Sequence, residues 1–258
     1  MCIRNYSRWS IVGLLVASVG LGAHANAQAA RYSVTDLGTL GGATSKGYGV
    51  NASGQVTGEA ATAEGVFHAF LYTPDRGMAD LGTLGGATSQ GYGVNASGQV
   101  TGDSVTAGGV FHAFLYIPDR GMADLGTLGG ATSQGYGVNA SGQVTGDSVT
   151  AGGVFHAFLY TPGRGMTDLG TLGGATSKGY GVNASGQVTG EAATAEGEFH
   201  AFLYANGVMR DLNSIIDSTT GVHVTLISGK GINDHGWIVA NGIDSRTGDT
   251  HAYLLSKR

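Results

Sequence analysis

The sequence predicts an all-β fold, a five-bladed β-propeller built from 44-residue repeats of four strands each. The segment DLGTLGG recurs at a constant spacing, starting at Asp36, Asp80, Asp124 and Asp168. Short apolar runs alternate with glycine-containing turns in a chain that has 48 glycines and only 12% charged residues. After residue 30 we find no segment with the spacing of an amphipathic helix.

The N-terminal 29 residues have the pattern of a secretory signal. Arg4 and Arg8 precede an apolar run at 11–23, and small residues at 23–30 offer A-x-A cleavage sites. We therefore expect a cleaved Sec-type signal peptide at 1–29 and a single repeat domain at 30–258. The protein would be secreted or periplasmic in a bacterium, without membrane insertion after cleavage. Cys2, the one cysteine, would leave with the signal, so no disulfide is expected.

Each repeat is expected to form four short strands. In the first repeat these are 46–50, 55–62, 66–73 and 78–84, separated by turns such as NASG and PDRG. The run VFHAFLYT is the richest in β-prone aromatic residues, so we expect it to be the central packing strand. The repeats span 36–79, 80–123, 124–167, 168–210 and 211–255.

The two ends of the repeat region complement each other. Segment 31–40 has the sequence of a fourth strand without the three before it, and 222–255 has three strands without a fourth. We expect the N-terminal strand to complete the last blade, which would leave no exposed sheet edge. A β-solenoid, with terminal repeats as caps, is the alternative architecture.

The motifs DLGTLGG, GYGVNASGQVTG and HAFLY together resemble the HAF family of bacterial extracellular repeat proteins. The resemblance covers 36–255, and it implies an extracellular location and a propeller-like fold. It implies no particular activity, because the family is defined by its repeat. The last copy departs from the pattern, because it reads HAYLL at 251–255, without the phenylalanine of HAFLY.

One histidine recurs within FHAFLY, and we expect it to be structural. Alternation along the strand places His68 on the same face as Phe70 and opposite Ala69. A neutral imidazole there would bond a backbone or hydroxyl group of the adjacent strand. No Cys, Asp or second His within the strand could complete a metal site. The histidines in question are His68, His112, His156, His200 and His251.

Two rows of tyrosines are the candidate binding residues. Exposed tyrosine rings stack on sugar rings, and repetition would give several equal, weak sites that act together. Packing between blades is the alternative role for the same residues. The first row is Tyr48, Tyr92, Tyr136 and Tyr180, and the second is Tyr72, Tyr116, Tyr160 and Tyr204.

Carboxylates also recur, but their pattern does not indicate catalysis. Glu59, Asp103, Asp147 and Glu191 occupy one repeated position, whereas a hydrolase needs two carboxylates in different environments. We therefore predict no catalytic residue, no metal and no cofactor. Thirteen Lys and Arg against 18 Asp and Glu argue against a nucleic-acid partner.

The expected function is that of a non-catalytic binding or interaction scaffold, multivalent for carbohydrate or another cell-surface polymer. One alternative is a polysaccharide-directed hydrolase or lyase with its site in the divergent last repeat; another is a structural matrix protein. The last repeat alone contains chemically distinct residues, namely Asp217, His223, Lys230, Asp234, His235, Trp237, Asp244, Arg246 and Asp249.

Overall fold

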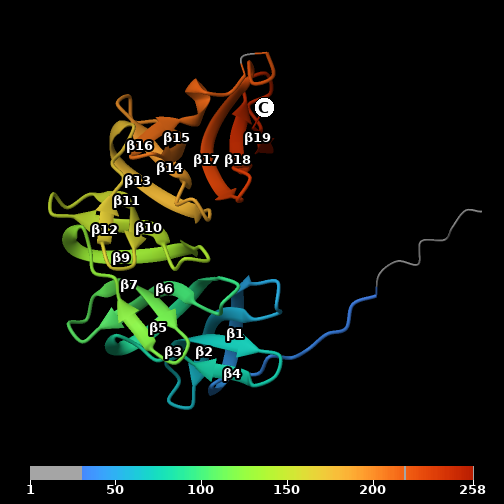
Figure 1. The fold of residues 1–258 in the computed structure, drawn as a ribbon, viewed down its shortest axis with the longest axis vertical. Helices are drawn as coiled ribbons and strands as arrows, with labels where there is room; N and C mark the ends of the chain where they lie inside the picture. The colour runs from blue at the N-terminus through green and yellow to red at the C-terminus, as the bar shows by residue number, and fades with distance from the viewer. Residues whose placement is uncertain (1–30, 218, 258) are drawn as a thin grey trace, which may run out of the picture. The chain divides into compact units, whose positions relative to one another are not determined.

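The computed structural model describes residues 31–217 and 219–257, so the signal peptide expected at 1–29 lies outside the described residues. The chain divides at Asp36 into two units, and the larger one begins at Leu37. The described part of the larger unit contains strands β1 to β19 and the short 3-10 helix η1 (Leu212–Ser214). The predicted all-β class is confirmed (Figure 1).

Five antiparallel sheets follow one another along the chain, and within each sheet the strands pair with their sequence neighbours. Sheet 1 contains β1 (Gly41–Val50), β2 (Val56–Thr62), β3 (Phe67–Thr73) and β4 (Gly77–Asp80). Sheet 2 contains β5 (Gly85–Val94), β6 (Val100–Thr106), β7 (Phe111–Ile117) and β8 (Gly121–Asp124). Sheet 3 contains β9 (Gly129–Val138), β10 (Val144–Thr150), β11 (Phe155–Thr161) and β12 (Gly165–Asp168). Sheet 4 contains β13 (Gly173–Val182), β14 (Val188–Thr194), β15 (Phe199–Ala205) and β16 (Val208–Asp211). Sheet 5 contains β17 (Val224–Ile232), β18 (Ile238–Asp244) and β19 (Thr250–Leu255).

The order of the strands agrees with the sequence prediction, but two of the predicted boundaries are wrong. The first strand of each repeat begins about five residues earlier, at Gly41 in sheet 1, and the fourth ends at Asp80 rather than at residue 84. The fourth strand stops because Gly82 has a φ of 72° and its N–H donates to the Asp80 side chain, 2.7 Å away. A turn of this kind ends the ladder.

The segment after each fourth strand carries the chain to the next sheet. Leu84 forms a parallel bridge to Thr106, and its N–H donates to Ser104 Oγ at 2.8 Å. Among the described residues, no strand ladder joins a strand of one sheet to a strand of the next. Successive repeats therefore do not share a continuous sheet, as the repeats of a β-solenoid would.

The hydrophobic core lies at the junctions between consecutive sheets. Ala69 and Leu71 of β3 pack with Val100 and Phe114 of sheet 2, and Leu81 of the connecting segment completes the cluster. The same set recurs at the next junctions. This confirms the alternation predicted for FHAFLY, in which Ala and Leu face one neighbouring sheet and the second Phe faces the other.

An asparagine in each NASG turn ties one sheet to the next. Asn95 Oδ1 accepts hydrogen bonds from the N–H groups of Ser97 and Gln99, both at 3.0 Å, which stabilises the turn. Its Nδ2 donates to the carbonyl of Asn139 in the following sheet, at 2.8 Å. Because the equivalent bonds recur from Asn51, Asn139 and Asn183, this one residue type sets both the turn and the spacing of the sheets.

The predicted closure of the last blade by the N-terminal strand is not confirmed. In the described part of the chain, sheet 5 has three strands, no strand is assigned at 31–39, and Leu40 bridges Thr62 of sheet 1. Both terminal sheets also leave apolar side chains uncovered. Val50 is 70% exposed and Leu254 is 67% exposed, whereas Leu115, the counterpart of Leu254 at an interior junction, is 3% exposed.

Candidate binding surface at the sheet junctions

The first predicted tyrosine row forms a continuous ladder along the first strands of sheets 1 to 4. The rings of Tyr48, Tyr92, Tyr136 and Tyr180 follow one another at centroid distances of 5.7, 5.8 and 5.9 Å, in tilted contacts. Aromatic pairs favour such geometry. In sheet 5 the corresponding position is Lys230, whose Nζ lies 3.9 Å from the centroid of the Tyr180 ring.

The hydroxyl groups of the ladder point at the repeated carboxylates. Tyr48 donates to Glu59 Oε1 at 2.8 Å. Tyr92 and Tyr136 each donate to a glutamine on their own strand, at 2.6 and 2.7 Å, and lie 3.3 and 3.4 Å from Asp103 and Asp147. Burial raises the pKa of the Tyr92, Tyr136 and Tyr180 phenols above the ordinary value. These tyrosines therefore act as hydrogen-bond donors, and the faces of their rings are largely in contact with the neighbouring tyrosine rings.

The carboxylates link neighbouring sheets through a donor on the following one. Gln134 Nε2 donates to Asp103 Oδ2 at 2.9 Å, and Lys178 Nζ lies 3.1 Å from Asp147 Oδ2. Lys230 Nζ lies 3.6 Å from Glu191. In sheet 1, Lys46 instead pairs with Glu59 of its own sheet at 2.8 Å.

Asp103 and Asp147 are both 2% exposed, yet they differ in their partners. Burial raises the pKa of Asp103 to about 6, and its Oδ1 has no hydrogen-bond partner. Burial also raises the pKa of Asp147, but the Lys178 ammonium opposes that shift. The Asp103 carboxyl group therefore binds a proton more readily than an ordinary aspartate, whereas Asp147 forms an ion pair with Lys178.

The second predicted tyrosine row lies elsewhere, on the third strands. Tyr116, Tyr160 and Tyr204 are half-buried and pack against the core clusters between the sheets. Tyr72 occupies the same position in β3 and is also half-buried. The structure does not bring this row together with the ladder.

A third aromatic row, which was not predicted from the sequence, consists of the first phenylalanine of each FHAFLY. Phe111, Phe155 and Phe199 are 40%, 44% and 48% exposed, which is unusual for so large an apolar side chain repeated in register. Phe155 and Phe199 flank a groove of about 290 Å³ between sheets 3 and 4. The polar lining of the groove includes Gln134, Asp147, Lys178 and Glu191. The period-two alternation of the strand was the available sequence signal. It places this phenylalanine at the end of its strand, where fewer neighbouring residues can cover the ring.

Four of the repeated histidines are bound to carboxylates. His68 Nδ1 lies 2.9 Å from Asp80 Oδ2, and the same pair recurs as His112–Asp124, His156–Asp168 and His200–Asp211 at 2.7–2.9 Å. We expected a backbone or hydroxyl partner; the aspartate that opens DLGTLGG takes that place. Each pair joins the third strand to the fourth. His251 of β19 lies beside Tyr253, with ring centroids 6.3 Å apart.

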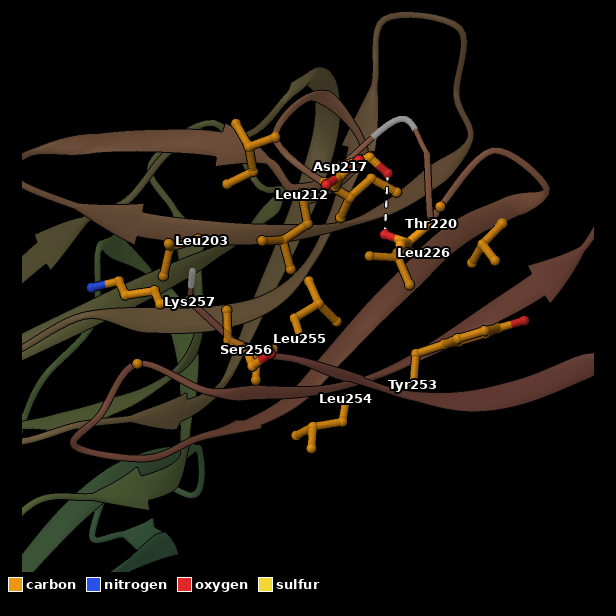
Figure 2. A pocket seen from close by; sticks show the side chains of 16 residues that line it. Leu203, Leu212, Asp217, Thr220, Leu226, Tyr253, Leu254, Leu255, Ser256 and Lys257 are labelled. Carbon is orange, nitrogen blue, oxygen red and sulfur yellow. Dashed lines mark hydrogen bonds between the residues drawn. The ribbon is translucent and has the colours of Figure 1, made fainter.

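A larger cavity, of about 660 Å³, opens in the last repeat between β15, η1, β17 and β19. Figure 2 shows Leu203, Leu212 and Leu226 on one side and the β19 residues Tyr253 and Leu255 on the other. Its polar rim includes Asp217, whose carbonyl accepts a hydrogen bond from Thr220 Oγ1 at 3.4 Å. The lining is mostly aliphatic, and the buried Tyr253 hydroxyl has no hydrogen-bond partner.

The chemically distinct residues of the last repeat do not converge on one site. Asp244 pairs with Arg246 at 2.5 Å, and that hydrogen bond holds the pKa of the Asp244 carboxyl well below its usual range. Asp234 accepts a hydrogen bond from the Ala184 N–H at 2.8 Å, and the rings of His235 and Trp237 lie 6.5 Å apart. Within the described ranges no group of three His, Cys, Asp or Glu side chains could hold a metal ion.

The fold has the architecture of propeller proteins. A protein assigned as TolB from Agrobacterium tumefaciens superposes with a TM-score of 0.52 at 12% identity, covering 78% of this chain and 76% of that one. A gluconolactonase from Xanthomonas campestris gives a TM-score of 0.44 at 13% identity, with coverages of 82% and 76%. The lectin BP39L from Burkholderia pseudomallei gives 0.42 at 11% identity, with coverages of 79% and 63%.

The similarity to the TolB structure shows the fold class alone: an all-β chain of propeller-type antiparallel sheets. No family model matches the sequence, and no curated protein matches it. In the part of the chain that the structure describes, no helix is long and apolar enough to cross a membrane.

Proposed function

We propose that this protein is a secreted, non-catalytic binding scaffold that presents several equivalent sites to carbohydrate or another cell-surface polymer. The supporting observation is that the junctions of consecutive sheets, from sheet 1 to sheet 4, are equivalent. The same aromatic, carboxylate and amide or lysine positions recur there with nearly the same contacts. Equal weak sites on one rigid frame gain strength when they engage one polymer together.

Binding of the purified protein to a glycan array tests this function, followed by a count of sites on the best ligand. We expect several equivalent sites for each chain, and stronger retention on a polymer than on a short oligosaccharide. A single site that survives removal of the sheet-junction aromatics and is lost by substitutions in the last repeat would overturn the proposal.

The motif resemblance supports a narrower assignment. DLGTLGG, GYGVNASGQVTG and HAFLY recur in the order and spacing of HAF repeats, so we assign the chain to that family as a proposal. An extracellular or periplasmic location in a bacterium follows from the same resemblance together with the signal-like pattern of 1–29.

We also propose that the five sheets close into a ring when the segment before Asp36 adds the fourth strand to sheet 5. Counted from the DLGTLGG aspartates, Val34 takes the position of Met122, which packs against the core between sheets 1 and 2. The core of sheet 5 has no methionine at that position, and the cavity beside Tyr253 and Leu255 lies there.

Two further observations support ring closure. Asp36 takes the position of the aspartates that bind the repeated histidines, so closure would give His251 the same carboxylate partner. The exposed Val50 of sheet 1 and Leu254 of sheet 5 are counterparts of residues that meet across the interior junctions. Closure would bury both and complete a fifth core cluster.

A further inference from the structure

The groove between sheets 3 and 4 combines two exposed aromatic rings with charged and amide side chains. Phe155 and Phe199 are the aromatic part of its lining, and each leaves nearly half of its surface in water. Exposed rings beside a hollow are typical of surfaces that take a ligand with an apolar face. At about 290 Å³ the groove lies near the lower end of the volumes found for ligand pockets.

The polar lining of the groove is close to electrically balanced. Asp147 is paired with Lys178 at 3.1 Å, and Glu191 lies 3.6 Å from Lys230. Carboxylate oxygens supply acceptors, and the Lys178 ammonium supplies donors. A strongly charged ligand would find no uncompensated partner here, whereas a ring bearing several hydroxyl groups could use both kinds.

Repetition puts each of the two middle rings, Phe111 and Phe155, at two junctions, whereas Phe67 and Phe199 are at one each. Phe155 lies in the groove with Phe199, and the repeat places it in the same relation to Phe111 at the junction of sheets 2 and 3. Phe67 begins the row in sheet 1, where Lys46 Nζ lies 6.0 Å from its ring centroid. In sheet 5 the position is Thr250, which pairs with Ile243 as Phe111 pairs with Val105. By repetition of the groove between sheets 3 and 4, sheets 1 to 4 have the phenylalanines for three such grooves, each bounded by two rings.

We propose that these three grooves each bind one neutral pyranose unit of a polysaccharide, with the shared phenylalanine rings as the stacking surfaces. This inference rests on the proposed binding function and deepens it. It moves the contact from the tyrosine ladder, in which Tyr92, Tyr136 and Tyr180 are half-buried, to the phenylalanine row, and it sets the number of sites at three.

Equilibrium dialysis of the full protein against neutral trisaccharides tests the proposal, with cellotriose, maltotriose and laminaritriose as probes and trigalacturonic acid as the charged comparison. Trisaccharides are short enough to count individual grooves. We expect three sites for at least one neutral probe, and weaker binding of trigalacturonic acid.

The variants distinguish shared grooves from independent sites. Phe155→Ala should remove two sites, because its ring bounds two grooves, and Phe199→Ala should remove one. Val208→Ala, which truncates a side chain that is 49% exposed on β16, is the matched control and should leave three. A melting curve for each variant checks that it is folded.

Equal losses from Phe155→Ala and Phe199→Ala, or no loss from either, would overturn the groove proposal. If glycans then still bind on the array, the general binding function stands and its site lies elsewhere. If no neutral trisaccharide binds the folded protein, the groove proposal fails. If the array is also blank, the proposed function fails with it.

Discussion

Among single residues, four of the five repeated histidines each join two strands through an aspartate. His112 Nδ1 lies 2.9 Å from Asp124 Oδ2, and Asp124 Oδ1 also accepts the Gly126 N–H at 2.7 Å. One carboxylate therefore fastens both the third strand and the turn that ends the fourth. The histidine side chain is 20% exposed and the aspartate 42%, so solvent weakens the pair.

His112→Ala should lower the free energy of unfolding by about 1 kcal/mol and leave glycan binding unchanged. The loss is modest because Asp124 keeps its bond to Gly126 and can be hydrated. Thermal melting with parallel binding measurements checks this, and Val208→Ala serves as the surface control. Lost binding at an unchanged melting temperature would show that the histidine contacts the ligand.

Asp103 should make stability depend on pH. Its folded-state pKa, about 6, lies above the ordinary carboxyl value, so the folded protein holds this proton more tightly than the unfolded chain does. The contribution of this group to stability is therefore greatest below about pH 4 and falls as the pH rises through about 6.

Asp103→Asn should raise the melting temperature at pH 8, with a gain in unfolding free energy of about 1–3 kcal/mol, and should change little at pH 4. An asparagine, Asn241, already occupies the corresponding place in sheet 5, where it pairs with Ser228. Asp147→Asn is the matched control: it breaks the Lys178 pair and should give no gain at pH 8. The same gain for both variants at both pH values would refute the assignment.

At the element scale, the first strands of consecutive sheets approach one another closely enough to require glycine. A Cβ on Gly93 would lie 2.7 Å from the carbonyl oxygen of Tyr136 in the next sheet, and Gly49 and Tyr92 have the same relation. Neither atom at these contacts is the end of a flexible side chain. The second glycine of the G-Y-G-V motif thus follows each of these ladder tyrosines at a position where a side chain would meet the backbone of the next sheet.

Gly93→Ala should lower the free energy of unfolding by about 1–3 kcal/mol, because the backbones of sheets 2 and 3 must separate. Gly108→Ala is the matched control, since the nearest atom to its Cβ would be Thr106 Oγ1 at 3.6 Å, an ordinary contact. Denaturant unfolding of the two variants measures the difference. Equal stabilities would mean that the junction adjusts without cost.

At the scale of the whole molecule, stability depends on whether the terminal sheets are covered. Leu71 and Leu115 at interior junctions are 7% and 3% exposed, but Leu254 and Val50 at the two ends are mostly exposed. The edge strand β19 also has no partner on its outer side among the described strands. Such an edge invites pairing with another chain unless something completes it.

Deletion of 31–36 should lower the melting temperature by about 5–10 °C and promote self-association, if this segment completes sheet 5. Scanning calorimetry and size-exclusion chromatography measure the two effects. Val34→Asp should reproduce the loss of stability, and Ser33→Asp, one residue away on the opposite face, should not. A monomer with unchanged melting temperature after the deletion would refute closure by this strand.

The number of repeats, the order of the strands and the two faces of FHAFLY could all be predicted from the sequence. These features are local: glycine and asparagine turns mark each boundary, and period-two alternation assigns each side chain to a face. The end of the fourth strand was misjudged because the LGTL segment looks β-prone, although Asp80 and Gly82 turn it toward the next sheet.

The tertiary structure, in contrast, was needed to identify which repeated residues face one another across the junctions. It showed that the histidines bind aspartates twelve or eleven residues further along, that the first tyrosine row covers itself, and that the phenylalanines flank a groove. Near-identical repeats carry no signal about contacts between repeats, because every copy offers the same candidates. The residues that meet across a junction depend on how the two sheets stack. Backbone contacts over the whole unit determine this stacking.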